Sequence, residues 1–262
     1  MTTSVFPPGP KARFPLDLYV RFRSDRIGFL EEMASFGDVS HLSFNNMHLY
    51  LLNHPDMIRD LLVNNHRQFT KSRALHLAEW LLGKGLLTSE GDFHLRQRRL
   101  VQPAFHRQRM AGYADVMAAY AARTADRWQD GARVNMAQEM MRLTLAIVGK
   151  TLFDADVEDE APQIGQALTE SLHAVNRMLL PGGSTMEKLP LPANRRAEDA
   201  RQLLNDTIYR IIRERRESGE DRGDLLSMLL QAQDEEGDGS RMTDEQVRDE
   251  AMTLFLAGHE TT

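Results

Sequence analysis

Stretches with a helical pattern of apolar residues account for most of the chain after residue 90. In such a pattern apolar side chains recur every three or four residues, which places them on one face of an α-helix. The stretches are 93–101, 110–128, 136–153, 163–179, 193–217, 224–233 and 244–262. The segments LLPGGS (179–184) and DEEGDGS (234–240) have turn-forming compositions. The Thr243–Gln246 pair at the start of the last stretch is typical of a capping box. The sequence therefore predicts a mainly α fold.

The first 70 residues are expected to be more varied. The proline-rich segment 1–16 should be extended, because proline fixes its own φ and restrains the preceding residue. Mixed three- and four-residue apolar steps predict a helix over 17–36. Apolar residues alternate on both sides of an Asn-Asn pair, which predicts a small β-hairpin near residues 41–53. Pro55 is expected to open a helix that runs to about Phe69.

Composition excludes several classes of function. A formal net charge of −6 argues against a nucleic-acid binder, which carries an excess of basic residues. No apolar run approaches the roughly 18 residues of a membrane anchor, and the N-terminus lacks the apolar core of a signal peptide. We therefore expect a cytoplasmic protein. The absence of cysteine excludes disulfides, thiolate metal sites and cysteine nucleophiles within this chain.

The last helical stretch has an unusual face. One stripe carries Val247, Ala251, Leu254, Gly258 and Thr261. It begins apolar, becomes very small at Ala257-Gly258 and ends polar. A glycine within a helix costs on the order of 1 kcal/mol relative to alanine. A flat or bulky group that approaches the backbone would justify that cost, and so would a close crossing with another helix.

A second candidate site lies in GDFHLRQRRLVQPAFH, residues 91–106. His94 and Arg98 are four residues apart and therefore share a helix face. The planar donor fork of arginine, with one more bond from the histidine, suits a carboxylate or phosphate. The alternative is a solvated basic helix, or arginines that pair with the acidic residues of the chain.

These segments resemble conserved segments of the cytochrome P-450 family. The run Ala257-Gly258-His259-Glu260-Thr261-Thr262 is similar to the oxygen-activating motif Ala/Gly-Gly-x-Asp/Glu-Thr-Thr/Ser. The segment 85–106 resembles the approach to the family's third main helix, where Trp or His precedes Arg by four positions. The PPGP start, the hairpin with the following Pro-led helix, and the segment 139–153 also fit, in the order of the family. The resemblance implies the N-terminal part of the cytochrome P-450 fold.

The resemblance also implies roles for particular residues. His94 and Arg98 would bond a haem propionate, in agreement with an anion site. Ala257 and Gly258 would lie against the haem face. Glu260 and Thr261 resemble the acid–alcohol pair that relays protons to dioxygen. The implied enzyme is a haem monooxygenase that inserts one atom of O2 into an apolar small molecule.

The electrons would come from an external donor protein, either a ferredoxin- or flavodoxin-like protein or a reductase, because the chain has no flavin or nicotinamide fingerprint. Four arginines offer a cationic face for an acidic donor: Arg96, Arg99, Arg107 and Arg109. A merely soluble surface explains them equally well. Apolar residues that could line a substrate pocket, or equally form core, are Phe69, Leu75, Leu77, Leu81 and Met178.

The chain departs from the family in its iron ligand. In the family a cysteine thiolate holds the iron, and this chain has no cysteine and no later Glu-x-x-Arg helix. We therefore expect one truncated domain over 1–262 that lacks the C-terminal haem-thiolate part and is inactive as it stands. His259 is not expected to bind metal, because a lone helical histidine is more often a surface or core residue.

Two other classes of protein compete with this interpretation. His259-Glu260-Thr261-Thr262 supplies four of the five positions of the zinc-protease motif His-Glu-x-x-His. A non-catalytic helical remnant that binds an apolar ligand or a partner helix is the other alternative. A remnant should expose apolar residues of the last helix, such as Val247, Leu254 and Phe255.

Overall fold

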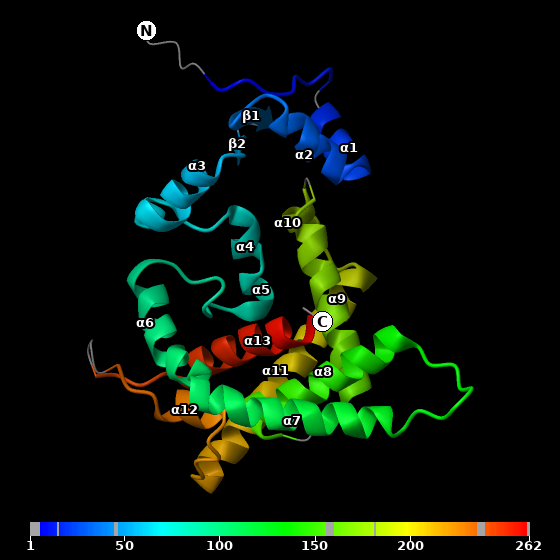
Figure 1. Cartoon of the computed structure of the whole chain (residues 1–262), viewed down its shortest axis with the longest axis vertical. Coiled ribbons are helices and arrows are strands. Elements are labelled where there is room, and N and C mark those ends of the chain that lie inside the picture. Colours follow the sequence, from blue (N-terminus) through cyan, green and yellow to red (C-terminus); the bar gives the residue numbers. More distant parts are fainter. Residues whose placement is uncertain are drawn as a thin grey trace. The chain divides into compact units, whose positions relative to one another are not determined.

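The computed structural model describes residues 6–14, 16–44, 47–155, 160–180, 182–234 and 239–260, without the side chains of Phe44, Ser184 and Glu260. The described part is mainly helical with one two-stranded sheet, which confirms the predicted fold class (Figure 1). Contacts divide the chain into two compact units, Met1–Thr70 and Lys71–Thr262. A single domain over 1–262 stays a prediction.

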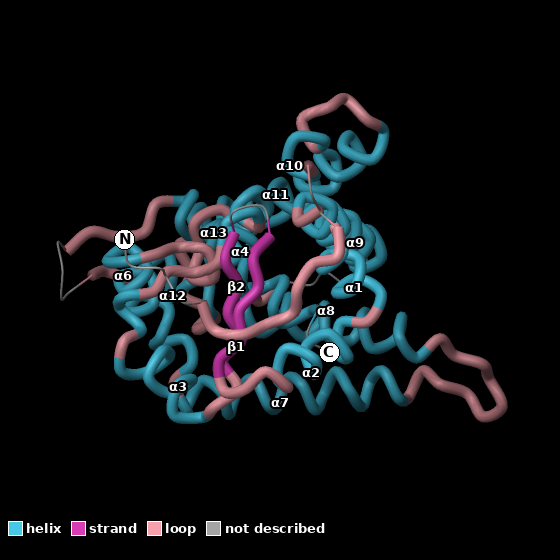
Figure 2. The backbone as a smooth tube through the Cα atoms, turned by 90° about the horizontal axis from the view of Figure 1, so that it is seen from above, coloured by secondary structure: helices cyan, strands magenta, loops and turns pink. Residues whose placement is uncertain are grey.

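The first unit combines short helices with the hairpin. Its elements are α1 (Asp17–Ser24), α2 (Arg26–Ala34), β1 (Val39–Phe44), β2 (Met47–Leu52), α3 (Pro55–Arg59), a π-helical turn η1 (Asp60–Asn64) and a 3-10 turn η2 (His66–Gln68). The strands pair antiparallel from Val39 with Leu52 to Phe44 with Met47, as Figure 2 shows in magenta. The predicted hairpin is therefore confirmed, although its Asn45-Asn46 pair lies outside the described residues. A small core of Leu18, Phe29, Met33 and Leu42 packs α1 and α2 against β1.

The helix predicted over 17–36 is in fact two helices. Asp25 has an extended backbone, with φ −148° and ψ 92°, and ends α1. Its Oδ1 then accepts a hydrogen bond from the Gly28 amide at 2.9 Å and so caps α2. An aspartate at this position satisfies a free amide of the first helical turn. The apolar spacing continues across the break, which is why periodicity did not reveal it.

The helix predicted from Pro55 to Phe69 is also wrong in its second half. Regular α-helix ends at Arg59, and the Asn65 amide bonds the Asp60 carbonyl five residues back at 2.8 Å. The side-chain amides of Asn64 and Asn65 both donate to the Asp60 carboxylate, at 3.1 and 3.0 Å. These local bonds favour the wider turn over continued α-helix.

The second unit is a helical assembly. Its elements are α4 (Arg73–Leu77), α5 (Glu79–Leu82), α6 (Gly91–Val101), a 3-10 turn η3 (Gln102–Phe105), α7 (Arg107–Ala125), α8 (Met136–Phe153), α9 (Ala161–Met178), α10 (Gly183–Met186), α11 (Pro192–Ser218), α12 (Leu225–Gln231) and α13 (Asp244–Glu260). Each stretch predicted as helix after residue 90 corresponds to one of these helices, and α8 has the predicted bounds.

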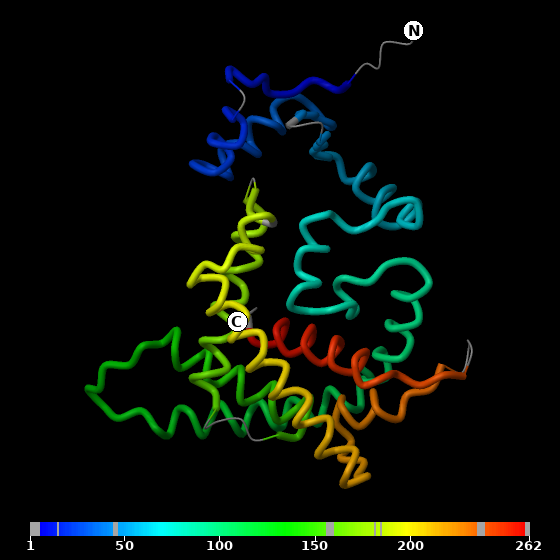
Figure 3. Tube along the Cα trace, turned by 180° about the vertical axis from the view of Figure 1, so that it is seen from behind, coloured from blue at the N-terminus to red at the C-terminus, as the bar shows by residue number. Residues whose placement is uncertain are grey.

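Helix α13 is the central element of the second unit (Figure 3, red). It packs against α5, α8, α11 and α12. Val247 is 0 % and Phe255 5 % exposed, and Leu254 is partly buried. The expectation that these side chains would be exposed is therefore wrong, because the surrounding helices already enclose this part of α13.

The start of α13 is capped as predicted. The Gln246 amide donates to Thr243 Oγ1 at 3.2 Å, and the Thr243 amide donates to Gln246 Oε1 at 3.0 Å. Two otherwise free amides at the helix start are thus satisfied reciprocally.

The loop between α5 and α6 is attached to α13 through its backbone. The Lys84 amide donates to Asp249 Oδ2 at 2.7 Å, and the Leu86 amide donates to Glu250 Oε2 at 3.0 Å. The close approach depends on Gly85, where a Cβ would lie 2.5 Å from Thr253 Oγ1 and 2.6 Å from the Asp249 carbonyl oxygen. These contacts fix the segment that leads into α6 against α13.

The charge-rich segment 210–224 contains a buried cation, Arg215, which is 5 % exposed. Arg215 donates to Asp224 Oδ1 at 2.7 Å, to the Phe153 carbonyl at 2.8 Å and to the Ser227 hydroxyl. Arg215 lies in the last turn of α11, and its guanidinium therefore joins this turn to the end of α8 and to the start of α12. The alternating charges in the sequence do not distinguish the buried Arg215 from the exposed arginines around it.

Candidate functional site

His94 lies on the first turn of α6 and is held by a lysine. Lys71 Nζ donates to the carbonyls of Leu86 and Ser89 at 2.9 and 2.7 Å, and lies 3.3 Å from His94 Nδ1. An ammonium has three protons to donate, so these three acceptors use all of them. Nδ1 then accepts, and the proton of the neutral imidazole lies on Nε2. Sequence reasoning missed Lys71, because it precedes His94 by 23 residues and belongs to no motif.

The surroundings of His94 lower its pKa and so favour the neutral imidazole. Partial burial lowers the pKa of His94 most, and the positive charges of Lys71 and Arg98 lower it further. A contact with the Leu86 carbonyl and the charge of Glu90 act in the opposite direction. Burial also lowers the pKa of Lys71, against the charges of Glu90 and Glu250.

Arg98 follows His94 by one turn of α6, as the spacing predicted. Its side chain is exposed, and within the described part of the chain its guanidinium has no hydrogen bond or ion pair. The influence of its charge on the pKa of His94 indicates that the two groups are neighbours. Together they present one permanent cation and one neutral N–H donor, a donor set that suits a carboxylate.

Three of the other arginines have hydrogen-bond partners within the chain. Arg99 donates to both carboxylate oxygens of buried Asp234 at 3.1 Å, and Arg96 donates to Ser240 Oγ at 2.7 Å. Arg109 donates to the Gly223 carbonyl. The side chains of Arg96 and Arg99 therefore tie α6 to the segment before α13, and a cationic face for an electron donor stays a prediction.

Glu250 is a buried carboxylate that sequence reasoning also missed. Its side chain is 0 % exposed, Oε2 accepts from the Leu86 amide, and Oε1 has no hydrogen-bond partner among the described residues. Burial raises the pKa of Glu250 to about 7; the Asp249 charge adds to this effect, while the Leu86 amide and Lys71 oppose it. A signal existed: Glu250, Leu254 and Ala257 follow one another at steps of four and three, so a charge occupies a stripe of otherwise apolar residues.

The small residues of α13 have one demonstrated packing role. Ala257 and Gly258 are both exposed. A Cβ on Gly258 would lie 2.6 Å from Val148 Cγ2 on α8. The glycine is therefore required by the crossing of α8 and α13, which was the structural alternative for this stripe.

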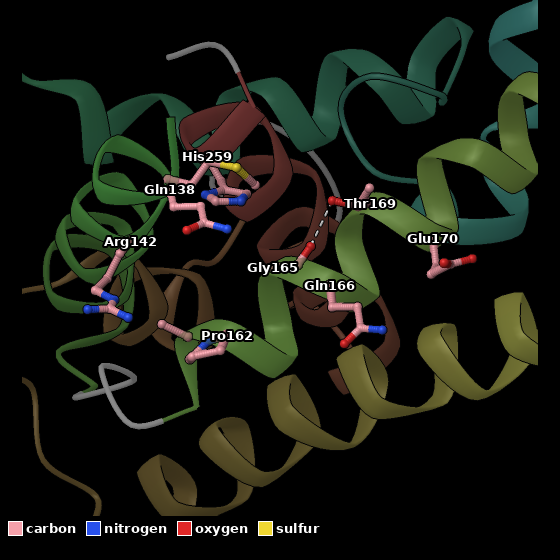
Figure 4. Close-up of a pocket in the computed structure, with 10 residues that line it drawn as sticks. Gln138, Arg142, Pro162, Gly165, Gln166, Thr169, Glu170 and His259 are labelled. Atoms are coloured by element: carbon pink, nitrogen blue, oxygen red, sulfur yellow. Dashed lines mark hydrogen bonds between the residues drawn. The ribbon is translucent and has the colours of Figure 1, made fainter. Parts of the chain in front are cut away.

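His259 is the next residue of α13. It is buried, and its Nδ1 lies 3.4 Å from Thr144 Oγ1 on α8. With residues of α8 and α9 it lines a pocket of about 450 Å³ (Figure 4). The expectation that His259 is a core or surface residue agrees with this position. The side chain of Glu260 and the whole of Thr261 lie outside the described residues.

Comparison with known proteins identifies the family. The model of the cytochrome P450 family matches residues 7–262, so the chain belongs to the cytochrome P450 family. It is 38 % identical over 236 residues to cyclooctatin synthase of Streptomyces melanosporofaciens, covering 89 % of this chain and 51 % of that protein. It is 35 % identical to cyclooctat-9-en-7-ol 5-monooxygenase of the same species, covering 89 % and 51 %. Pentalenene oxygenase of Streptomyces avermitilis is also 35 % identical, with the same coverage.

The chain thus spans about half the length of these curated relatives. Membership of the family implies haem as the cofactor and decides against the zinc-protease alternative. Within the described ranges, no helix is both long and apolar enough to cross a membrane.

Proposed function

We propose that the whole protein is a haem-dependent monooxygenase that inserts one oxygen atom of O2 into an apolar organic substrate. The observation that carries the proposal is one connected arrangement. The His94–Arg98 donor pair of α6 follows a loop that is hydrogen-bonded to α13, and α13 ends in Ala-Gly-His-Glu, the start of a sequence typical of the family. The family match over residues 7–262 supports the same function.

His94 and Arg98 would hold the propionates of the haem. The guanidinium of Arg98 is exposed, and Lys71 leaves the Nε2–H of His94 as a donor. Both groups are hydrogen-bond donors, and an ionised carboxylate is only an acceptor, so the two sides are complementary. Bound haem supplies the iron centre at which dioxygen is reduced.

The other roles are assigned on the family motif. Ala257 and Gly258 would leave room for the haem face on the exposed side of α13. The hydroxyl of Thr261 would donate a proton during reduction of dioxygen, and the carboxyl of Glu260 would restore it. An electron-donor protein, ferredoxin- or flavodoxin-like or a reductase, would supply two electrons. The names of the relatives make an apolar cyclic compound the first substrate class to test.

We further propose that these 262 residues alone are inactive, because no cysteine is present to supply the thiolate ligand. The test is a titration of this chain with haemin, followed by reduction and addition of carbon monoxide. Haemin should bind, Arg98→Ala and His94→Ala should each weaken binding about tenfold, and the red-shifted band of a haem-thiolate should be missing. Arg107→Ala, an exposed arginine on α7, is the matched control.

Two results would count against these proposals. Unchanged haemin affinity in both His94→Ala and Arg98→Ala would remove the propionate assignment. A red-shifted carbon monoxide band from this chain would contradict the proposed inactivity.

A further inference from the structure

The peptide groups of Leu86 are held from two directions. Its amide donates to Glu250 Oε2 at 3.0 Å, and its carbonyl accepts from Lys71 Nζ at 2.9 Å. Lys71 in turn lies 3.3 Å from His94 Nδ1. A continuous series of polar contacts therefore runs from Glu250 on α13, through Leu86 and Lys71, to the imidazole on α6.

The burial of Glu250 is energetically unfavourable. The side chain is completely buried, and Oε1 is without a hydrogen-bond partner in the described part of the chain. Burying a carboxylate costs free energy that an apolar side chain would not. The charged groups that act on it are Asp249 of its own helix and Lys71. A group retained at such a cost has a role that an apolar residue would not fill.

The position of Glu250 along α13 suggests that role. Glu250 and Ala257 are seven residues apart, so they lie on the same face and about 10 Å apart along the axis. Glu250 thus occupies the face of α13 that continues to the exposed small residues. At the other end of the polar series is His94, the neutral half of the donor pair.

We propose that Glu250 is a positioning residue that fixes His94 relative to the Ala257–Gly258 face of α13 through the Leu86 peptide and Lys71. The inference rests on the proposed function, in which these two elements contact one haem. The carboxyl acts by its reach and by its acceptor oxygen. A glutamine therefore replaces it, whereas an aspartate, one methylene shorter, does not reach the Leu86 amide.

The experiment compares Glu250→Gln, Glu250→Asp and Glu250→Ala in the full chain without haem, with Glu245→Ala as a control on the exposed first turn of α13. Hydrogen exchange is measured at the Leu86 amide, and the pKa of His94 is measured by NMR. In the Asp and Ala variants, exchange at Leu86 should be about tenfold faster, the effect of losing one hydrogen bond. The pKa of His94 should rise towards its ordinary value, because burial and Lys71 both lower it in the wild type.

The Gln variant and the control should match the wild type in both measurements. Wild-type exchange at Leu86 in the Asp variant would overturn the proposal, as would a Gln variant that behaves like the Ala variant. Should the Ala variant not fold, the comparison of Gln with Asp decides alone. General destabilisation would accelerate exchange in α11 as well and would leave no rescue by Gln, which also contradicts a positioning role.

A parallel haemin titration separates this inference from the function on which it rests. Faster Leu86 exchange together with no haemin binding by the wild type would refute the haem site and keep the positioning role. Haemin binding by the wild type together with unchanged Leu86 exchange in the Asp and Ala variants would support the haem site and refute the positioning role.

Discussion

Asp249 Oδ2 accepts a hydrogen bond from the Lys84 amide at 2.7 Å, although 165 residues separate the two in sequence. The other oxygen of the same carboxylate accepts from Arg248 at 2.8 Å. Arg248 also donates to the Leu81 carbonyl and to Asn205 Oδ1, at 2.7 and 2.8 Å. The end of α5, the middle of α11 and the first half of α13 therefore meet at one polar junction, and changes at this junction should affect the whole second unit.

Gly85→Ala should lower the free energy of unfolding by about 1–3 kcal/mol, the usual cost of overpacking. The new Cβ would lie 2.5 Å from Thr253 Oγ1 and 2.6 Å from the Asp249 carbonyl, so the loop or α13 has to move. Urea denaturation measures the loss. The matched control is Gly112→Ala in α7, where nothing lies within 4 Å of the new Cβ and alanine should stabilise the helix by about 0.5–1 kcal/mol. Equal changes in both variants would show that the contact at Gly85 is absent.

Glu250→Gln should remove a pH dependence of stability. The pKa of Glu250 is raised in the folded chain from 4.5 to about 7, so the folded state keeps a proton that the unfolded state releases. The free energy of unfolding therefore falls as the pH rises from about 4.5 to about 7, by about 3 kcal/mol for this group. The free energy of unfolding of the variant, measured relative to that of the wild type by urea denaturation, should therefore be higher at pH 8 than at pH 5. Glu245→Gln, on the exposed first turn, should show no such change, and a pH-independent difference for Glu250→Gln would refute the prediction.

Arg215→Met should lower the free energy of unfolding by about 3–5 kcal/mol, the typical cost of leaving a buried charge without its partner. Both Arg215 and Asp224 have side chains that are 4 % exposed and lie 2.7 Å apart. Adding Asp224→Asn should recover part of the loss, since asparagine removes the charge and can still cap α12. Arg213→Met, an exposed neighbour on α11, serves as control. The ion pair contributes little if Arg215→Met and Arg213→Met unfold at the same urea concentration.

Local patterns in the sequence predicted local structure well. The bounds of α8 and the capping box of Thr243 and Gln246 follow from apolar spacing and from residues three positions apart. The break at Asp25 was missed because a capping side chain interrupted the backbone without interrupting the apolar spacing.

The candidate site was only partly predictable for a related reason. His94 and Arg98 share a helix turn, so their spacing placed them together. Lys71 and Glu250 reach the same region from 23 and 156 positions away from His94, and no periodicity connects such distant residues. Only the presence of a carboxylate on the stripe of Leu254 and Ala257 pointed to Glu250.

The attachment of the α5–α6 loop to α13 uses the amides of Lys84 and Leu86 and none of their side chains. Substitutions at these two positions can therefore change the side chain without removing the hydrogen bonds that hold the loop. Proline alone is barred there, because it has no N–H to donate, and Gly85 is barred from gaining any side chain. The position of this loop on α13 is thus set by its backbone rather than by its side chains.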